Sequence, residues 1–234
     1  MSRQPENTAL ADRVTSAVAR PVDALRISEI FFSLQGETSR SGLPTVFIRL
    51  TGCPLRCGYC DTAYAFSGGR TQSFAEILSA VAQHRTRYVT VTGGEPLAQK
   101  QCIALLRELC DRDYSVSLET SGALDVAAVD ARVSKILDIK TPASGEVEKN
   151  LWSNLAHLTP HDEIKFVICD EHDYAWARQQ LAERGLDALC PVLFSPSYRD
   201  LPAAQLAEWI LRDQLPVRFQ TQLHKQLWGE KPGV

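Results

Sequence analysis

The sequence predicts an α/β fold in which one mostly parallel sheet forms a partial (β/α)6 barrel, similar to a TIM barrel but two units short of its eight. Short apolar runs alternate with segments of helical periodicity, and strands that alternate with helices form right-handed crossovers in a parallel sheet. The 234 residues are 44% hydrophobic and 23% charged, as in a globular domain with one sizeable core. Neither an internal repeat nor a low-complexity linker interrupts the pattern.

Seven apolar runs have the length and composition of strands. In chain order they are Arg26–Phe32, Val46–Leu50, Tyr88–Thr92, Ser115–Glu119, Lys135–Ile139, Ile164–Ile168 and Pro191–Phe194. The last six are the expected barrel strands. We therefore expect one domain over residues 26–234, preceded by a partly ordered extension at residues 1–25 with a short helix near residues 9–19.

Three segments between these runs carry apolar side chains at the spacing of one helix face. The positions are Phe74, Ile77, Leu78, Val81 and Ala82 in the first segment, and Ile103, Leu106 and Cys110 in the second. In the third they are Leu206, Trp209, Ile210 and Asp213, a face that is apolar except at Asp213. Each segment is expected to form a helix that packs on the sheet.

The charge balance and the apolar runs exclude several classes of protein. The net charge is −3 and no block of Lys or Arg is present, which argues against binding of nucleic acid through its phosphates. No apolar run approaches the roughly 20 residues of a membrane span. The first residues lack the apolar core of a signal peptide, so we expect a cytoplasmic protein. In that compartment the seven cysteines are expected to be thiols, metal ligands or core residues.

Polar, glycine-rich segments follow five of the predicted barrel strands. They are Thr51–Cys60, Gly93–Pro96, Thr120–Gly122, Lys140–Ser144 and Ser195–Ser197. Because the carboxyl ends of parallel strands meet at one edge of a sheet, these segments are expected to form the active site together.

Three cysteines lie close together in the first of these segments. Cys53, Cys57 and Cys60 form a C-x3-C-x2-C pattern, and thiolates favour zinc or iron–sulfur centres. Three ligands leave one metal position open, whereas a structural zinc site needs a fourth. The alternatives are free thiols, or a zinc site completed by a distant histidine, namely His84, His157, His161, His172 or His224. Cys102, Cys110, Cys169 and Cys190 have no ligand spacing and are expected to be core residues.

The cysteine pattern resembles that of the radical S-adenosylmethionine enzymes. Tyr59 before the last cysteine fits this family, and Gly93–Pro96 is similar to its Gly-Gly-Glu motif, which contacts the amino group of the cofactor. The resemblance implies that three cysteines hold a 4Fe-4S cluster whose fourth iron binds S-adenosylmethionine. One-electron reduction then yields a 5′-deoxyadenosyl radical.

Further segments resemble one branch of this superfamily, the 7-carboxy-7-deazaguanine synthases. They are Leu34-Gln35-Gly36-Glu37, Arg49, Cys60-Asp61-Thr62, Thr92 and His224-Lys225, and the likeness extends from about residue 26 to the end. It implies a lyase of queuosine biosynthesis, a tRNA modification pathway. The implied reaction converts 6-carboxy-5,6,7,8-tetrahydropterin into 7-carboxy-7-deazaguanine, with loss of ammonia and regeneration of S-adenosylmethionine.

The resemblance implies a role for each matched residue. S-adenosylmethionine is expected to contact Tyr59, Cys60, Asp61, Gly94, Lys140 and Ser195, with Ser144 as a competitor of Lys140. The substrate is expected to contact Leu34, Gln35, Gly36, Glu37, Arg49, Thr92, His224 and the terminal carboxylate of Val234. Glu37 is the expected catalytic residue and accepts from the guanidine-like edge of the pterin. Thr62 is expected to bind Mg²⁺ together with the substrate carboxylate.

The resemblance also implies partners and leaves two alternatives. We expect a flavodoxin or ferredoxin-type electron donor, a homodimer and no direct contact with tRNA. One alternative is a glycyl-radical-enzyme activase, which acts on a protein and needs an open groove rather than the pterin-binding set of Gln35, Glu37, Arg49 and His224. The other is a non-catalytic iron–sulfur or zinc module, in which Gly93–Pro96 has no purpose.

Overall fold

A nine-stranded sheet in the order β3-β1-β2-β4-β5-β6-β7-β8-β9 forms the centre of the computed structural model, which describes residues 23–231 and 233. The strands are β1 (Ala24–Leu34), β2 (Pro44–Leu50), β3 (Arg70–Ser73), β4 (Tyr88–Gly93), β5 (Ser115–Thr120), β6 (Ser134–Ile139), β7 (Glu163–Ile168), β8 (Val192–Pro196) and β9 (Arg218–Phe219). From β2 through β4 to β9 all neighbouring strands pair in parallel, whereas β1 pairs antiparallel with β2 and β3. The predicted partial barrel is confirmed: β2 and β4 to β8 are the six expected barrel strands, and β9 adds a seventh parallel strand at the edge.

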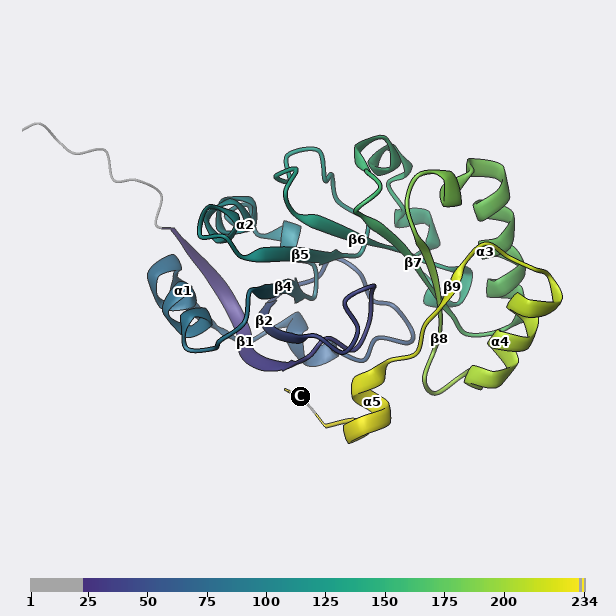
Figure 1. Cartoon of the computed structure of the whole chain (residues 1–234), viewed down its shortest axis with the longest axis horizontal. Helices are drawn as coiled ribbons and strands as arrows, with labels where there is room; N and C mark the ends of the chain where they lie inside the picture. The colour runs from purple at the N-terminus through teal and green to yellow at the C-terminus, as the bar shows by residue number, and fades with distance from the viewer. Residues whose placement is uncertain (1–22, 232, 234) are drawn as a thin grey trace, which may run out of the picture.

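Five α-helices accompany the sheet in the described residues. They are α1 (Phe74–Ala82), α2 (Cys102–Asp111), α3 (Glu171–Arg184), α4 (Ala203–Arg212) and α5 (Leu223–Trp228). Figure 1 shows α1 and α2 at the end of the sheet near β1 and β4, α3 and α4 at the other end, and α5 apart from them near the C-terminus. Within residues 23–231 and 233, no helix combines the length and the apolar character that crossing a membrane requires.

The three helices expected from periodicity are confirmed, and local capping explains where two helices begin. Ser73 and Glu76 form a reciprocal capping box at the start of α1. The helix α3, for which the sequence showed no apolar periodicity, has Asp170 as its N-cap, whose side chain accepts from the Asp173 N–H, and Gly185 in the left-handed conformation as its C-cap. The apolar pattern of α3 is weak because charged and amide side chains occupy half of its fourteen positions. Asp170 and Gly185 were therefore the sequence features from which this helix could have been predicted.

Two of the expected helical crossovers contain no α-helix. Turns connect β5 to β6, and three short 3₁₀ helices, Pro142–Ser144, Val147–Lys149 and Trp152–His157, connect β6 to β7. Buried Asn154 satisfies the backbone of the first connection: its amide nitrogen donates to the carbonyls of Gly122 and Leu124 at 3.1 and 2.9 Å. A side chain thus supplies hydrogen bonds that a helix would supply internally.

The first strand begins slightly earlier than predicted, and three of the four scattered cysteines are buried. β1 begins at Ala24, two residues before the predicted strand, and Leu25 is already part of the core. The short helix expected near residues 9–19 lies outside the described residues. Cys102, Cys110 and Cys190 are buried, as expected of core residues, and Cys169 is partly exposed.

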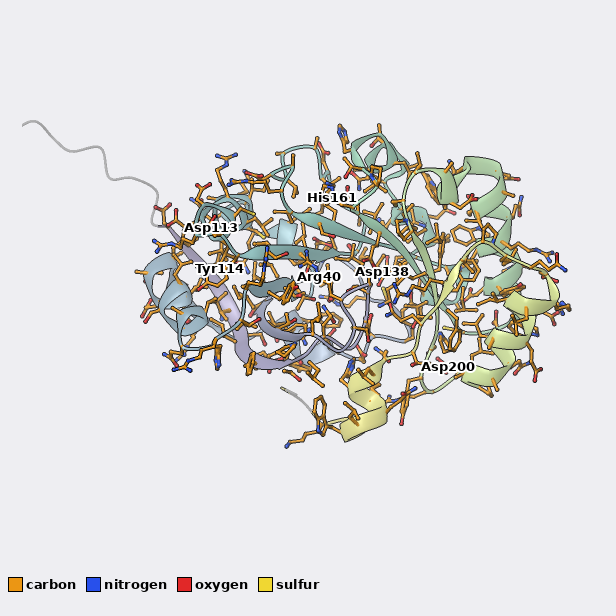
Figure 2. All side chains as sticks on the ribbon, viewed as in Figure 1. Arg40, Asp113, Tyr114, Asp138, His161 and Asp200 are labelled. Carbon is orange, nitrogen blue, oxygen red and sulfur yellow. The ribbon has the colours of Figure 1, made fainter. Side chains whose placement is uncertain are left out.

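The loop between β1 and β2 contacts strands well separated in the sheet. The Gln35 amide donates to Thr90 on β4 at 3.2 Å, and a guanidinium nitrogen of Arg40 donates to the Ser115 carbonyl on β5 at 3.0 Å. Figure 2 shows Arg40 over this part of the sheet. The backbone N–H of Ser39 donates to Glu163 on β7 at 3.0 Å. Residues 35–40 therefore span from β4 to β7 and place Gln35 and Glu37 among the parallel strands.

Candidate active site

A cavity of about 680 Å³ lies at the carboxyl ends of the parallel strands. Nearly all residues expected at the site line it: Leu34, Gln35, Gly36, Glu37, Arg49, Cys53, Cys57, Tyr59, Cys60, Asp61, Thr62, Thr92, Gly94, Lys140, Ser195 and His224. Ser144 is not among the lining residues, because its buried hydroxyl donates to the Thr141 carbonyl at 2.6 Å. Val234 lies outside the described residues. The structure therefore brings together sixteen of the eighteen positions.

The three cysteines lie on the loop between β2 and a short 3₁₀ helix at Ala63–Phe66. The Cys60 N–H donates to the Cys57 carbonyl at 3.1 Å, and the Gly58 N–H donates to the Ser144 carbonyl at 3.0 Å. These bonds hold the loop in a turn with its thiols at the cavity. Burial raises the pKa of Cys57 to about 11, so metal binding there must displace a proton.

The three thiols are not gathered at a preformed site for a single metal ion. Thiolates around one tetrahedral zinc, with bonds of about 2.3 Å, lie about 3.8 Å from one another. In residues 23–231 and 233, the group of three or more potential ligands within 4.8 Å of one another is Asp170, His172 and Asp173, not the cysteines. The three cysteine sulfurs therefore do not all lie within 4.8 Å of one another.

Gly94 lets β4 approach the cysteine loop closely. A Cβ at this position would lie 2.3 Å from the Gly52 oxygen and 2.7 Å from the Cys53 Cβ, so any other residue would displace the loop. The side chain of Glu95 is fully buried and accepts from the Thr120 hydroxyl at 3.0 Å and the Ser121 N–H at 2.7 Å. Glu95 therefore links β4 to β5, and the backbone at Gly94 supports the cysteines.

Two buried polar atoms beside the cysteines have no hydrogen-bond partner in the described residues. They are the Tyr59 hydroxyl and the Oδ1 atom of Asp138, and both residues line the cavity. Figure 2 shows Asp138 near the middle of the sheet. The other Asp138 oxygen lies 3.1 Å from the Lys140 Nζ, which is 5.9 Å from the centre of the Tyr59 ring. Since buried polar groups are normally paired, these atoms indicate a ligand with polar groups of its own.

Glu119 on β5 was missed by sequence reasoning and lies at the centre of the cavity's polar network. Its carboxylate accepts from the Gln35 amide at 3.3 Å and from the Thr92 hydroxyl at 2.9 Å. Burial and the neighbouring charge of Glu37 raise the pKa of Glu119. The side-chain Oε1 atom of Gln35 in turn accepts from the Glu37 N–H at 3.1 Å.

Lys165 on β7, also missed, forms an ion pair with Glu37. Burial opposes ionisation of Glu37, but Lys165 overrides it and lowers the pKa of that carboxyl. Glu37 is therefore ionised at neutral pH. The sequence did contain a signal for this ion pair: Lys165 interrupts the apolar run Ile164–Ile168, and a charge inside a buried strand needs a partner.

Glu29 on β1 pairs in register with Arg49 on β2 and orients its side chain. The Arg49 Nε donates to Glu29 at 2.7 Å, and the Tyr64 hydroxyl donates to the same oxygen at 2.7 Å. The guanidinium also lies 5.6 Å from the centre of the Phe31 ring. Its two Nη atoms make no hydrogen bond within the described residues, which leaves them available to an anion in the cavity.

The C-terminal segment closes the cavity beside the loop of Gly36. The Leu223 N–H donates to the Gly36 carbonyl at 2.9 Å. His224 packs so closely that a Cβ on Gly36 would lie 2.2 Å from its Nδ1 atom. Burial lowers the pKa of His224 and favours its neutral form. Lys225 donates to Asp61 at 2.8 Å and, although burial acts in the opposite direction, lowers the pKa of Asp61 to about 2.

The chain resembles known proteins in sequence and structure. Residues 47–142 match the model of the Radical SAM superfamily. The 7-carboxy-7-deazaguanine synthase of Chlorobaculum tepidum is 48% identical over 88% of this chain and 94% of that protein, and the one from Koribacter versatilis is 43% identical over 90% and 100%. A crystal structure of QueE from Escherichia coli superposes with a TM-score of 0.71 over 86% of this chain and 95% of that chain, at 23% identity. That last likeness concerns the fold.

Proposed function

Since the chain belongs to the 7-carboxy-7-deazaguanine synthases, enzymes of the Radical SAM superfamily, we propose that it converts 6-carboxy-5,6,7,8-tetrahydropterin into 7-carboxy-7-deazaguanine in queuosine biosynthesis. The reaction contracts the pterin ring and releases ammonia. One observation carries the proposal: a single cavity joins the cysteine loop to the ionised Glu37 and to the free Nη atoms of Arg49.

The family implies a 4Fe-4S cluster and S-adenosylmethionine, and the residues present fit both. Cys53, Cys57 and Cys60 would hold the cluster at one side of the cavity. The unpartnered Tyr59 hydroxyl and the closely packed Gly94 support a cofactor beside them, with Asp61, Lys140 and Ser195 completing the proposed contacts. When bound and reduced, the group supplies a radical that takes a hydrogen atom from the substrate. We propose that a flavodoxin or a ferredoxin donates the electron that reduces the cluster.

The charges of the cavity suggest one orientation for the substrate. Arg49 presents two N–H groups from a guanidinium held by Glu29, a geometry suited to a carboxylate. The ionised Glu37 can accept from the guanidine-like edge of the pterin. Gln35 and Thr92 are held beside it through Glu119, and His224 closes the same side. We therefore propose that the substrate carboxylate faces Arg49 and its pterin edge faces Glu37.

We propose that Thr62 binds Mg²⁺ together with the substrate carboxylate. Its hydroxyl lies at the cavity, 3.9 Å from the Cys60 sulfur. Thr62→Ala should retain the iron content of wild type but lose about tenfold in magnesium-dependent activity, since Mg²⁺ takes oxygen ligands. Activity titrated with MgCl₂ after chelation checks this expectation. An unchanged magnesium response would remove Thr62 as a ligand.

Glu37→Gln should weaken substrate binding and leave cleavage of S-adenosylmethionine possible. The substitution removes the negative charge that pairs with Lys165 and accepts from the substrate. We expect KM for the pterin to rise about tenfold, in keeping with the loss of a charged hydrogen bond. Steady-state kinetics and 5′-deoxyadenosine formation without the pterin are the two measurements. Wild-type kinetics would exclude Glu37 from the pterin site.

The proposed function itself is tested anaerobically. The full chain is reconstituted with iron and sulfide, reduced with dithionite, and supplied with S-adenosylmethionine and 6-carboxytetrahydropterin. Mass spectrometry should detect 7-carboxy-7-deazaguanine. Formation of 5′-deoxyadenosine without that product would contradict the substrate and favour a glycyl-radical-enzyme activase. Formation of neither product from a loaded cluster would favour a binding module.

We further propose that the enzyme is a homodimer. Sedimentation of the same preparation tests this proposal.

A further inference from the structure

The segment at residues 220–225 connects the loop that carries Glu37 to the loop that carries the cysteines. On one side, the Gln220 amide exchanges two hydrogen bonds with the Thr38 backbone, at 2.6 and 2.9 Å, and Leu223 bonds to Gly36. On the other side, Lys225 bonds to Asp61 at 2.8 Å. Asp61 directly follows Cys60, so the segment reaches both ends of the cavity.

Gln222 makes the most direct connection between the two loops. Its amide nitrogen donates to Glu37 at 2.9 Å and to Asp61 at 3.2 Å. A single NH₂ group thereby bonds one carboxylate from the substrate side and one from the cofactor side. The Lys225 side chain is 10% exposed and its Nζ is 5.2 Å from the centre of the Tyr198 ring, so the contact with Asp61 is held by packing as well as charge.

We propose that Gln222 and Lys225 are positioning residues that couple the binding of S-adenosylmethionine to the binding of the pterin. This inference rests on the proposed function of the cavity. A pterin that contacts Glu37 orders the loop at residues 35–38 and the segment bonded to it. S-adenosylmethionine beside Asp61 requires order in the same segment. The ligand that binds second therefore loses less conformational entropy, which makes the two binding events cooperative.

The test measures binding without turnover. The dissociation constant of S-adenosylmethionine is measured on the reconstituted, unreduced full-length protein, with and without saturating 6-carboxytetrahydropterin. In wild type the pterin should tighten S-adenosylmethionine binding about tenfold, within the usual range of coupling between sites. By reciprocity S-adenosylmethionine should tighten pterin binding by the same factor. In Gln222→Leu both factors should fall below about twofold.

Gln226→Leu is the matched control. Gln226 lies on helix α5, whose N-cap is Gln222, is exposed, and donates to the Thr221 hydroxyl at 2.9 Å rather than to either loop. It should keep the coupling factor of wild type. Equal factors in wild type and Gln222→Leu, or an equal loss in both glutamine variants, would overturn the inference.

Two lysine variants keep the test decisive if Gln222→Leu folds poorly. Lys225→Met should lower the coupling factor, whereas Lys225→Arg keeps a cation at Asp61 and should restore it. No difference between these variants would contradict the inference. If wild type binds both ligands but independently, the coupling is wrong and the proposed function stands. If wild type binds neither ligand, the proposed function fails and the inference fails with it.

Discussion

Cys57→Ala is expected to abolish assembly of the 4Fe-4S cluster and with it all turnover. Cys57 lies between the other two cysteines on the loop after β2, and its thiol faces the cavity. Two remaining thiols supply too few ligands for a cluster held at three protein positions. Iron and sulfide content, the visible absorption of the reconstituted protein and 5′-deoxyadenosine formation are the measurements.

Cys102→Ala is the matched control for this variant. Cys102 is fully buried on α2, away from the cavity lining. Its replacement by alanine should lower thermal stability modestly, by about 1 kcal/mol, and leave iron content unchanged. A Cys57→Ala protein with the iron content and radical yield of wild type would refute the assignment of the cysteine loop.

Lys165→Met is expected to reduce kcat/KM by about 100-fold, because leaving one charge of a buried pair without its partner in a binding site costs about 2–5 kcal/mol. Lys165 lies among three carboxylates: it pairs with Glu37, Glu119 is close by, and Asp138 is its register partner on β6. Without this cation Glu37 and Glu119 repel each other without compensation. One of them should then stay protonated at neutral pH.

The pH dependence of pterin binding distinguishes this effect from general damage. Lys165 lowers the pKa of Glu37, so wild type has an ionised Glu37 at all but acidic pH. In Lys165→Met that pKa should rise, and binding that needs the carboxylate should recover only as pH increases through the raised value. Equilibrium titrations between about pH 5 and 8.5 check the direction, a range chosen around the titration of a buried carboxyl. An unshifted profile would contradict the role given to Lys165.

A second buried lysine provides the control. Lys135 at the start of β6 pairs with Asp162 at 3.0 Å, and both side chains are buried outside the cavity lining. Lys135→Met should destabilise the protein by about 3–5 kcal/mol through the unpaired Asp162. Below its lowered melting temperature it should retain the kcat/KM and the pH profile of wild type.

Local patterns were sufficient for the six expected barrel strands and for the cysteine loop. Each barrel strand is a largely apolar run of five to seven residues, so its place in the sequence is visible without tertiary contacts. β9 is a two-residue strand and was missed because its pairing with β8, not its composition, makes it a strand. Ser144 differs in another way: its spacing permitted a place at the cavity, but the turn at Thr141 directs its hydroxyl back to the chain.

The residues around Glu37 depended on contacts that no local pattern contains. Glu119, Lys165 and Gln222 come from β5, β7 and the segment before α5, separated by dozens of residues. The parallel register, which pairs Asp138 with Lys165, and the loop that crosses from β4 to β7 bring them together. The cysteines are readable from sequence because eight residues of chain hold the whole ligand set. The network of Glu37, Glu119 and Lys165 cannot be predicted from the sequence, because its members become neighbours only when the sheet forms. Burial then makes it costly to leave any of these charges without a partner.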